Sequence, residues 1–233
     1  MKIIVVAGDK GGTGKTFVAL LIADWLRVNA KEPECWDFDQ SNSAGFGLYW
    51  EGAKKGNLDE RGALFRPFAG QNVGDLGDRV LLLDLGARNE AKAGAWFDAA
   101  GSFLEQKEAA VKWTVVVPVT ADEASWWSAH AWVKRASGRA SVLLIKNQGE
   151  EAYRDFGRWD RHPETLALKK KGLAEELDLR SAAPELTEYA RAHKLRIGQI
   201  AAGAAGSLAE QMMAAAVAAP FYAELDGRKE LLL

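Results

Sequence analysis

Residues 8–16 read Gly-Asp-Lys-Gly-Gly-Thr-Gly-Lys-Thr. This stretch matches the phosphate-binding loop pattern G-x-x-x-x-G-K-[ST]. Its surroundings fit as well, because residues 2–7 (KIIVVA) predict a buried strand and residues 16–28 predict a helix. A strand, a glycine-rich turn and the start of a helix together favour a site for a phosphate group.

Each residue type in the loop has a part in that chemistry. Glycines let backbone N–H groups turn toward an anion, and the helix start adds unpaired donors and the positive end of the helix dipole. Lys15 can reach the β- and γ-phosphates of a nucleotide, and the Thr16 hydroxyl can bind Mg²⁺. A glycine-rich turn that binds nothing is the alternative. The residues expected to contact the nucleotide are Gly11, Gly12, Thr13, Gly14, Lys15, Thr16 and Phe17.

A second lysine, Lys10, opens the run KGGTGKT. Here the chain resembles the deviant Walker A family of ParA and MinD ATPases, whose mark is K-G-G-x-G-K-[ST]. The resemblance implies an ATP-bound homodimer in which Lys10 reaches the partner's nucleotide and, with Lys15, acts in catalysis. A cation supplied in this way neutralises charge that develops on the transferred phosphoryl group. The alternative for Lys10 is a solvated loop lysine.

A carboxylate that binds Mg²⁺ is expected at the end of a buried strand. Asp84 follows the apolar residues 80–83, which is the Walker B arrangement, and ligands bind at the carboxyl ends of strands in such sheets. An aspartate that only caps a helix or forms a turn is the alternative.

Residues 37–43 (DFDQSNS) resemble the family's D-x-D-P-Q-x-N segment, which forms switch I, although the proline is missing. The period of two places Asp37 and Asp39 on the same side of an extended chain. By resemblance, Asp39 orients the attacking water, and Asp37 supports Mg²⁺ through its hydration shell. The alternative is a loop rich in turn-forming residues.

Four further positions follow from the same resemblance. Gly86 is expected to offer a backbone N–H to the γ-phosphate, and Arg88 is either a second interface cation or a surface arginine. Asn147 ends a predicted strand and would contact adenine, unless it is a turn residue before Gly149. Pro184 is expected beside the base.

The alternation of strands and helices predicts an α/β fold: one domain over residues 1–233 with a doubly wound, mostly parallel sheet flanked by helices, as in P-loop NTPases. We expect strands at 2–7, 34–39, 63–68, 79–84, 112–117, 141–145 and 176–179. We expect helices at 16–28, 89–110, 122–135, around 150–160, at 164–171 and at 201–219.

Composition sets limits on the class of protein. The net charge of −2 gives no overall attraction to nucleic acid or membrane, and the single cysteine, Cys35, excludes a disulfide framework and paired cysteines for an iron–sulfur cluster. The three histidines at 130, 162 and 193 are far apart in sequence, without metal-ligand spacing, and are interpreted as surface or packing residues. We see no signal peptide or membrane span and expect a cytoplasmic protein.

Two surfaces are candidates for partners. Residues 134–171 hold ten basic and five acidic residues, a net charge of +5, which indicates either a surface for non-specific DNA or a solvated face. Trp126, Trp127 and Trp132 share one predicted helix, which we interpret as core, with a partner-binding face as the alternative. The last nine residues do not form a basic amphipathic helix, so a membrane anchor is disfavoured.

The sequence therefore predicts an Mg²⁺-dependent ATPase of the short ParA type that cycles between ATP and ADP. We expect slow hydrolysis that an adaptor protein stimulates. The first hypothesis is plasmid or DNA partition with non-specific DNA binding, and the second is a positioning or conjugation scaffold with little DNA affinity. A metabolic ligase with a phosphate loop, similar to dethiobiotin synthetase, is disfavoured by Lys10 and by the segment around Asp37 and Asp39.

Overall fold

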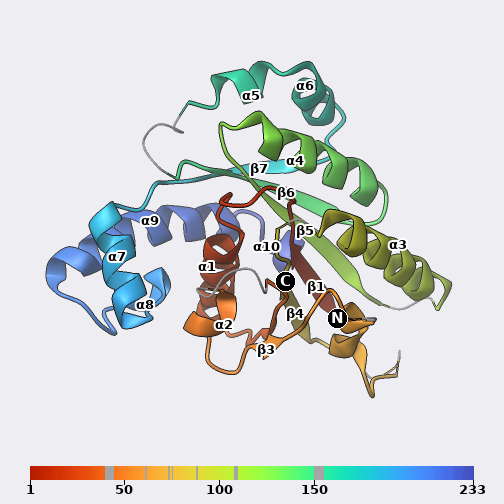
Figure 1. The fold of residues 1–233 in the computed structure, drawn as a ribbon, viewed down its shortest axis with the longest axis horizontal. Helices are drawn as coiled ribbons and strands as arrows, with labels where there is room; N and C mark the ends of the chain where they lie inside the picture. Colours follow the sequence, from red (N-terminus) through yellow and green to blue (C-terminus); the bar gives the residue numbers. More distant parts are fainter. Residues whose placement is uncertain are drawn as a thin grey trace.

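Seven strands form one parallel sheet in the part of the chain that the structure describes, in the order β3-β2-β4-β1-β5-β6-β7 (Figure 1). The computed structural model describes residues 1–39, 45–60, 62–72, 74, 76–87, 89–107, 110–149 and 155–233. The strands are β1 (Lys2–Val6), β2 (Glu34–Asp37), β3 (Lys54–Lys55), β4 (Val80–Asp84), β5 (Lys112–Val119), β6 (Ser141–Asn147) and β7 (Glu175–Leu179).

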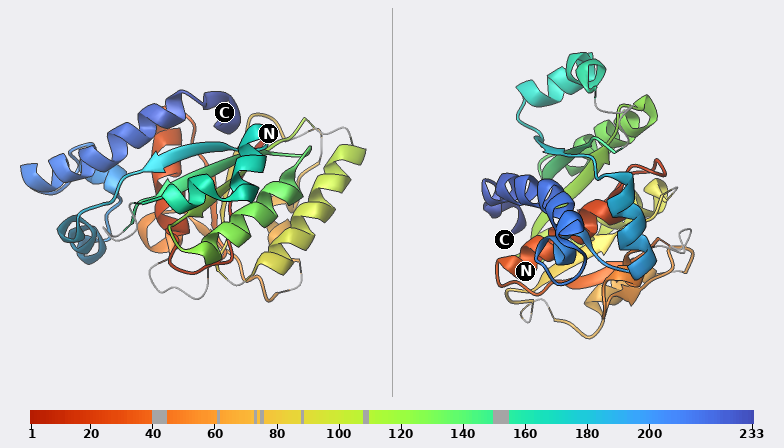
Figure 2. Two further views of the ribbon diagram at one scale, coloured as in Figure 1. Left: turned by 90° about the horizontal axis from the view of Figure 1, so that it is seen from above. Right: turned by 90° about the vertical axis from the view of Figure 1, so that its left-hand side faces the viewer.

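Helices cover both faces of the sheet, as the two views of Figure 2 show. The helices are α1 (Lys15–Val28), α2 (Phe46–Tyr49), α3 (Glu90–Gln106), α4 (Glu123–Ala136), α5 (Gly157–Arg161), α6 (Pro163–Lys170), α7 (Pro184–His193), α8 (Ile197–Ala201), α9 (Leu208–Asp226) and α10 (Lys229–Leu232), together with a 3₁₀ helix, η1 (Ala63–Phe68).

The central strand β1 has a core on each side. Ile3 and Val5 belong to the apolar cluster that includes α3 and α4, and Ile4 and Val6 belong to the cluster that includes α1 and α9. Because successive side chains of a strand point to opposite faces, a strand that is covered on both faces has a continuous apolar sequence. This is why residues 2–7 predict a buried strand without alternation.

The register of the sheet gathers the ends of three strands at one edge. Val6 at the end of β1 lies opposite Asp84 at the end of β4, and Asp84 lies opposite Asp37 at the end of β2. The phosphate-loop sequence follows β1 directly. The loop and the two carboxylates therefore meet at the carboxyl edge of the sheet, where ligands bind in open α/β folds.

The α/β class and the parallel sheet are confirmed, and most predicted elements lie within a few residues of their expected positions. One strand prediction was wrong, because residues 63–68 form the 3₁₀ helix η1. The buried residues there are Ala63, Leu64 and Pro67, a helical spacing rather than a period of two. The short strand β3 lies in a segment for which the sequence predicts no strand.

The helix expected over residues 201–219 is also shifted. It spans the end of α8 and the start of α9, and the segment between them contains Gly203 and Gly206. Ser207 begins α9 with a capping box that it forms with Glu210. None of the helices that the structure describes combines the length and apolar character needed to cross a bilayer.

Candidate nucleotide site

The loop of residues 8–14 runs from the end of β1 to the start of α1 and has the backbone shape of an anion-binding turn. Gly14 is the N-cap of α1, with φ 86° in the left-handed region. A Cβ atom at this position would lie 2.3 Å from Nδ2 of Asn147, so no larger residue fits without a shift of that side chain. The start of α1 therefore lies directly against Asn147 at the carboxyl end of β6.

Helix α1 begins with Lys15 and Thr16, whose side chains contact different partners. The Lys15 ammonium donates a hydrogen bond of 2.9 Å to the carbonyl oxygen of Lys10 and so folds over the loop. Burial lowers the pKa of Lys15, although the carboxylates of Asp84, Asp39 and Asp9 oppose this effect. The Thr16 hydroxyl donates a hydrogen bond of 2.7 Å to Oδ2 of Asp84.

Asp84 is a buried carboxylate with one oxygen still available. Its Oδ1 atom is buried and has no hydrogen-bond partner within the described part of the chain. Burial is the largest cause that raises the pKa of Asp84 to about 7. A hydroxyl and a carboxylate with an unpartnered oxygen are hard oxygen donors of the kind that Mg²⁺ prefers, so Thr16 and Asp84 fit the expected metal.

Asp37 lies opposite Asp84 at the end of β2, and both of its carboxylate oxygens accept hydrogen bonds from the backbone. Its Oδ1 and Oδ2 atoms accept hydrogen bonds of 2.9 Å from the backbone N–H groups of Asp39 and Gly47. Asp37 thus holds the chain that follows β2, while Asp39 lines the cavity beside the loop. The rest of the predicted switch segment, residues 40–43, lies outside the described residues.

Gly86 lies against the same segment. A Cβ atom at this position would come within 2.9 Å of the Cα atom of Asp39. Any residue other than glycine would therefore displace the backbone of Asp39. This contact ties the turn after β4 to the turn after β2. Arg88 lies outside the described residues.

A cavity of about 750 Å³ opens beside the loop, large enough for a nucleotide. One wall is the loop and the start of α1, including Lys15, Thr16 and Phe17, and Asp39 and Ala87 extend this wall. The other wall comes from α7, α8 and Tyr49. The residues of this second wall that come from the C-terminal part are Thr187, Ala190, Arg191, Leu195, Arg196 and Ile197.

Asn147 and Pro184 are not among the described residues that line this cavity. The Asn147 amide donates to the carbonyl oxygen of Thr13 at 2.9 Å and accepts from the N–H of Gly149 at 3.0 Å. The hydrogen bond with Gly149 is the one expected for a turn asparagine, the alternative interpretation. The hydrogen bond to Thr13 also ties the phosphate loop to the end of β6. Pro184 is the first residue of α7, one turn before Thr187 of the cavity wall.

Lys10 points away from the cavity. Its ammonium forms an ion pair of 3.1 Å with Asp122, the residue that caps α4. A second hollow of about 580 Å³ lies on this side of the loop, and Lys10, Glu90 and Trp127 are among its lining residues. The lysine therefore stands at the outer rim of the loop, half exposed.

Arg196 is the residue of the site that the sequence patterns did not reveal. It lies before α8, and its guanidinium is buried against Asp24 of α1 at 2.8 Å and donates to the carbonyl oxygen of Tyr49 at 2.9 Å. It also lies 4.5 Å from the ring centre of Trp50. No local motif marks Arg196, because the residues that its guanidinium contacts, Asp24, Tyr49 and Trp50, are distant in sequence.

The tryptophan-rich helix α4 has both buried and exposed tryptophans. Trp126 and Trp132 are buried in the core, whereas Trp127 is 61% exposed and faces the hollow beside Lys10. The core interpretation is thus confirmed for two of the three residues, and Trp127 remains a candidate for a partner surface.

The basic region of residues 134–171 is extensively ion-paired. Pairs connect Lys134 to Glu164, Arg158 to Glu123, Lys146 to Asp178, Arg139 to Asp98 and Lys169 to Asp160. Glu150, Glu151 and Arg154 lie outside the described residues. Among the described residues, no ion pair is found for Arg161, Lys170 and Lys171.

The three histidines are far apart in sequence, as expected, but His130 and His162 are neighbours in the structure. The rings of His130 and His162 stack with their centres 5.2 Å apart. His193 lies on α7, where its ring contacts Tyr189.

Comparison with known proteins assigns no family to the chain. No protein-family model and no curated protein matches the chain. One similar structure is a nucleotide-binding protein from Archaeoglobus fulgidus in complex with ADP, with a TM-score of 0.47 and 15% identity over 83% of this chain and 87% of that chain. Another is a complex of a variant of Cyanothece McdA with ATP, with a TM-score of 0.43 and 13% identity over 86% of this chain and 90% of that chain. At these values the similarity concerns the fold alone.

Proposed function

We propose that the chain is an Mg²⁺-dependent ATPase that acts as a nucleotide-controlled switch of the deviant Walker A type. The observation that carries the proposal is the joint placement of Thr16 and Asp84, which are bonded at 2.7 Å at the mouth of the phosphate loop beside Lys15. A phosphate loop, a metal-binding hydroxyl and a strand-end carboxylate are the parts that phosphoryl transfer requires.

In this proposal each residue of the site has a separate role in binding or hydrolysis of ATP. The loop N–H groups and Lys15 hold the phosphates, after the Lys15 ammonium exchanges the Lys10 carbonyl for a phosphate oxygen. Thr16 and Asp84 would hold Mg²⁺, which when bound neutralises charge on the β- and γ-phosphates. Asp39 lines the cavity and would orient the attacking water, and Asp37 holds the segment that carries Asp39.

Lys10 is the switch residue in this proposal. The ion pair with Asp122 holds it at the rim of the loop. When two ATP-bound protomers meet face to face, Lys10 leaves Asp122 and reaches the nucleotide of the partner. Both side chains are about two-fifths exposed, so the ion pair is weak and can exchange for a phosphate contact.

The test compares Lys10→Ala with Asp122→Asn. We expect Lys10→Ala to bind ATP normally but to lose ATP-dependent dimerisation and turnover. Asp122→Asn keeps a good helix cap and removes only the charge, so we expect more dimer at a given ATP concentration, by up to about fivefold. Size-exclusion chromatography with light scattering and a phosphate-release assay measure both effects.

Lys31→Ala is the matched control, because Lys31 follows the far end of α1 and should leave dimerisation unchanged. Normal dimerisation and turnover of Lys10→Ala would remove Lys10 from the trans role. Failure of the wild-type chain to bind ATP in the presence of Mg²⁺ would overturn the proposal as a whole.

Two kinds of cargo are open to such a switch. In the first, the ATP dimer grips non-specific DNA through residues 134–171, for plasmid or DNA partition. In the second, it is a scaffold for a protein partner, with hydrolysis stimulated by an adaptor. The ion pairs within the basic region favour the second, because they reduce the positive charge that is available to phosphates.

A further inference from the structure

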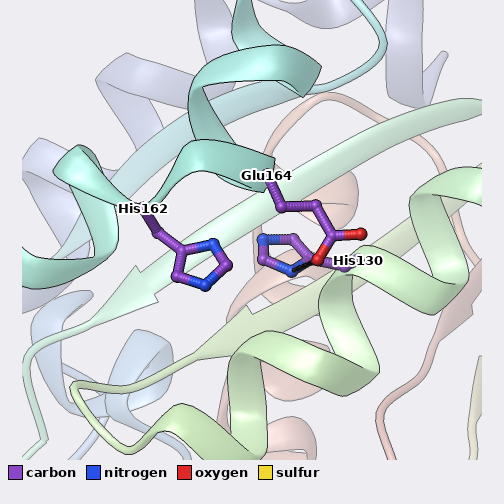
Figure 3. A group of neighbouring side chains, drawn as sticks. All are labelled: His130, His162 and Glu164. Carbon is purple, nitrogen blue, oxygen red and sulfur yellow. Dashed lines mark ion pairs between the residues drawn. The ribbon is translucent and has the colours of Figure 1, made fainter.

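Three side chains on the outer side of α4 converge on one small gap (Figure 3). His130 comes from α4, His162 is the residue before α6, and Glu164 lies in the first turn of α6. One ligand atom from each residue lies within 4.8 Å of the other two. Among the described residues this is the one place where three or more His, Cys, Asp or Glu side chains come close enough to share a metal ion.

The nitrogen atoms of the two histidines are the decisive feature. The Nδ1 atoms of His130 and His162 are both buried and have no hydrogen-bond partner in the described part of the chain. The Nδ1 atom of His130 lies 3.0 Å from Oε2 of Glu164, without the alignment of a hydrogen bond. A buried nitrogen atom without a hydrogen bond is costly, and a cation placed between the two Nδ1 atoms and the Glu164 carboxylate would contact all three groups.

The other nitrogen of His130 is already engaged. Its Nε2 atom lies 2.9 Å from the hydroxyl oxygen of Thr165, and the side chain of His130 is only 2% exposed. When Nε2 donates to this hydroxyl, the lone pair of Nδ1 is left for a metal, as in known metal sites.

Aromatic rings hold the donors in place. His130 stacks on Trp159 at 5.2 Å, and His162 makes edge contacts with Trp126 and Trp127, each at 5.9 Å. These rings limit the rotation of both imidazoles and keep bulk water from one side of the gap. A rigid and partly dry shell strengthens metal ligation.

The donor set selects the kind of ion. Two imidazole nitrogens and one carboxylate suit Zn²⁺ and its neighbours in the transition series, whereas Mg²⁺ and Ca²⁺ prefer oxygen donors. Tetrahedral Zn²⁺ with bonds of about 2.0–2.1 Å needs ligand atoms about 3.3 Å apart. Here the ligand atoms lie within 4.8 Å of one another, and one pair of them is 3.0 Å apart. Three protein ligands leave one position for water.

We propose that His130, His162 and Glu164 form a binding site for Zn²⁺ or a closely related divalent transition-metal ion, which fastens α6 to α4. The site is separate from the nucleotide cavity and does not depend on the proposed ATPase activity. Lys134 competes for it, because its ammonium pairs with the other oxygen of Glu164.

The test is a titration of the nucleotide-free, full-length protein with ZnCl₂ by calorimetry, in an excess of Mg²⁺ that occupies all-oxygen sites. We expect one Zn²⁺ per chain and a rise in the midpoint of thermal unfolding. Titration with Co²⁺ should also quench part of the tryptophan fluorescence, because three indoles surround the site.

Variants locate the site. His162→Gln and Glu164→Gln should weaken Zn²⁺ binding about tenfold or more. His193→Gln is the matched control and should bind like the wild type, because His193 lies on α7. Lys134→Met should bind Zn²⁺ more tightly, which tests the site in the direction of gain even where a ligand variant folds poorly.

Two results would overturn the proposal. The first is the absence of saturable Zn²⁺ binding to the wild-type chain. The second is binding of equal affinity to the wild type and to a folded His162→Gln or Glu164→Gln protein, which would place the ion elsewhere.

Discussion

Gly14 stands at a position where a side chain is excluded for two separate reasons. Its φ of 86° is unfavourable for other residues, and a Cβ atom would meet the Asn147 amide at 2.3 Å. The glycine of the sequence motif thus serves the fit between the loop and β6 as well as the approach of a phosphate.

We expect Gly14→Ala to lower the free energy of unfolding by about 1–2 kcal/mol for the backbone, with about 1 kcal/mol more for each Asn147 hydrogen bond that is lost. Gly52→Ala is the matched control, since Gly52 has φ 83° and nothing within 4 Å of a Cβ atom. Urea unfolding of both variants separates the two causes. Equal losses would show that the Asn147 contact contributes nothing.

Because of Asp84, we expect the free energy of unfolding to depend on pH. Burial raises its folded-state pKa to about 7, well above the value of about 4 in an unfolded chain. A raised carboxyl pKa stabilises the folded state at low pH, and this contribution falls as the pH rises from about 4 to about 7. The free energy of unfolding in EDTA without nucleotide should therefore decrease over this range.

Asp84→Asn mimics the neutral carboxyl and should flatten that slope. Urea unfolding at pH 5, 6, 7 and 8 makes the comparison. A wild-type slope identical to that of Asp84→Asn would mean that the carboxylate is not destabilised by its surroundings.

Among the elements, α8 is fixed to α1 by a single buried ion pair. Arg196 and Asp24 are each about nine-tenths buried and lie 2.8 Å apart. Arg196 also lines the nucleotide cavity, so this pair sets the distance between the loop wall and the C-terminal wall.

We expect Arg196→Ala to lower the free energy of unfolding by about 3–5 kcal/mol, because it leaves the Asp24 carboxylate buried without its partner. Arg191→Ala is the control, since Arg191 lines the same cavity but is exposed. Exchange of both members of the pair, Asp24→Leu with Arg196→Met, should recover part of the loss. A loss below about 1 kcal/mol for Arg196→Ala would indicate that water solvates Asp24.

At the scale of the whole molecule, the positive charge available on the surface distinguishes a DNA-binding switch from a scaffold for a protein partner. A DNA-binding dimer should bind non-specific duplex in ATP and Mg²⁺ but not in ADP and Mg²⁺. Six to ten phosphate contacts would weaken this binding by about a thousandfold or more between 50 and 200 mM salt. Fluorescence anisotropy with labelled duplex at two salt concentrations measures both effects.

Reversal of charge at Lys170 and Lys171 should weaken such DNA binding, because these lysines lack ion pairs among the described residues. Absence of DNA binding in both nucleotide states would favour a protein partner. Trp127, exposed beside Lys10, is then the first surface to test.

The sequence by itself determined the α/β class, most of the strands and helices, and the positions of the phosphate-loop pattern, Asp39 and Asp84 along the chain. These are local patterns: apolar runs predict buried strands, and motif residues lie next to one another or at the end of a strand. The error at residues 63–68 came from a short apolar run, in which strand and helix are hard to tell apart.

Only the tertiary structure decided which distant residues complete the site. Asn147 supports Thr13 from 134 positions away, Arg196 pairs with Asp24 across 172 positions, and Lys10 meets Asp122. His130 and His162 likewise meet only because α6 packs beside α4. Such contacts depend on how the sheet orders its strands and where the helices lie on it, and no local periodicity records that arrangement.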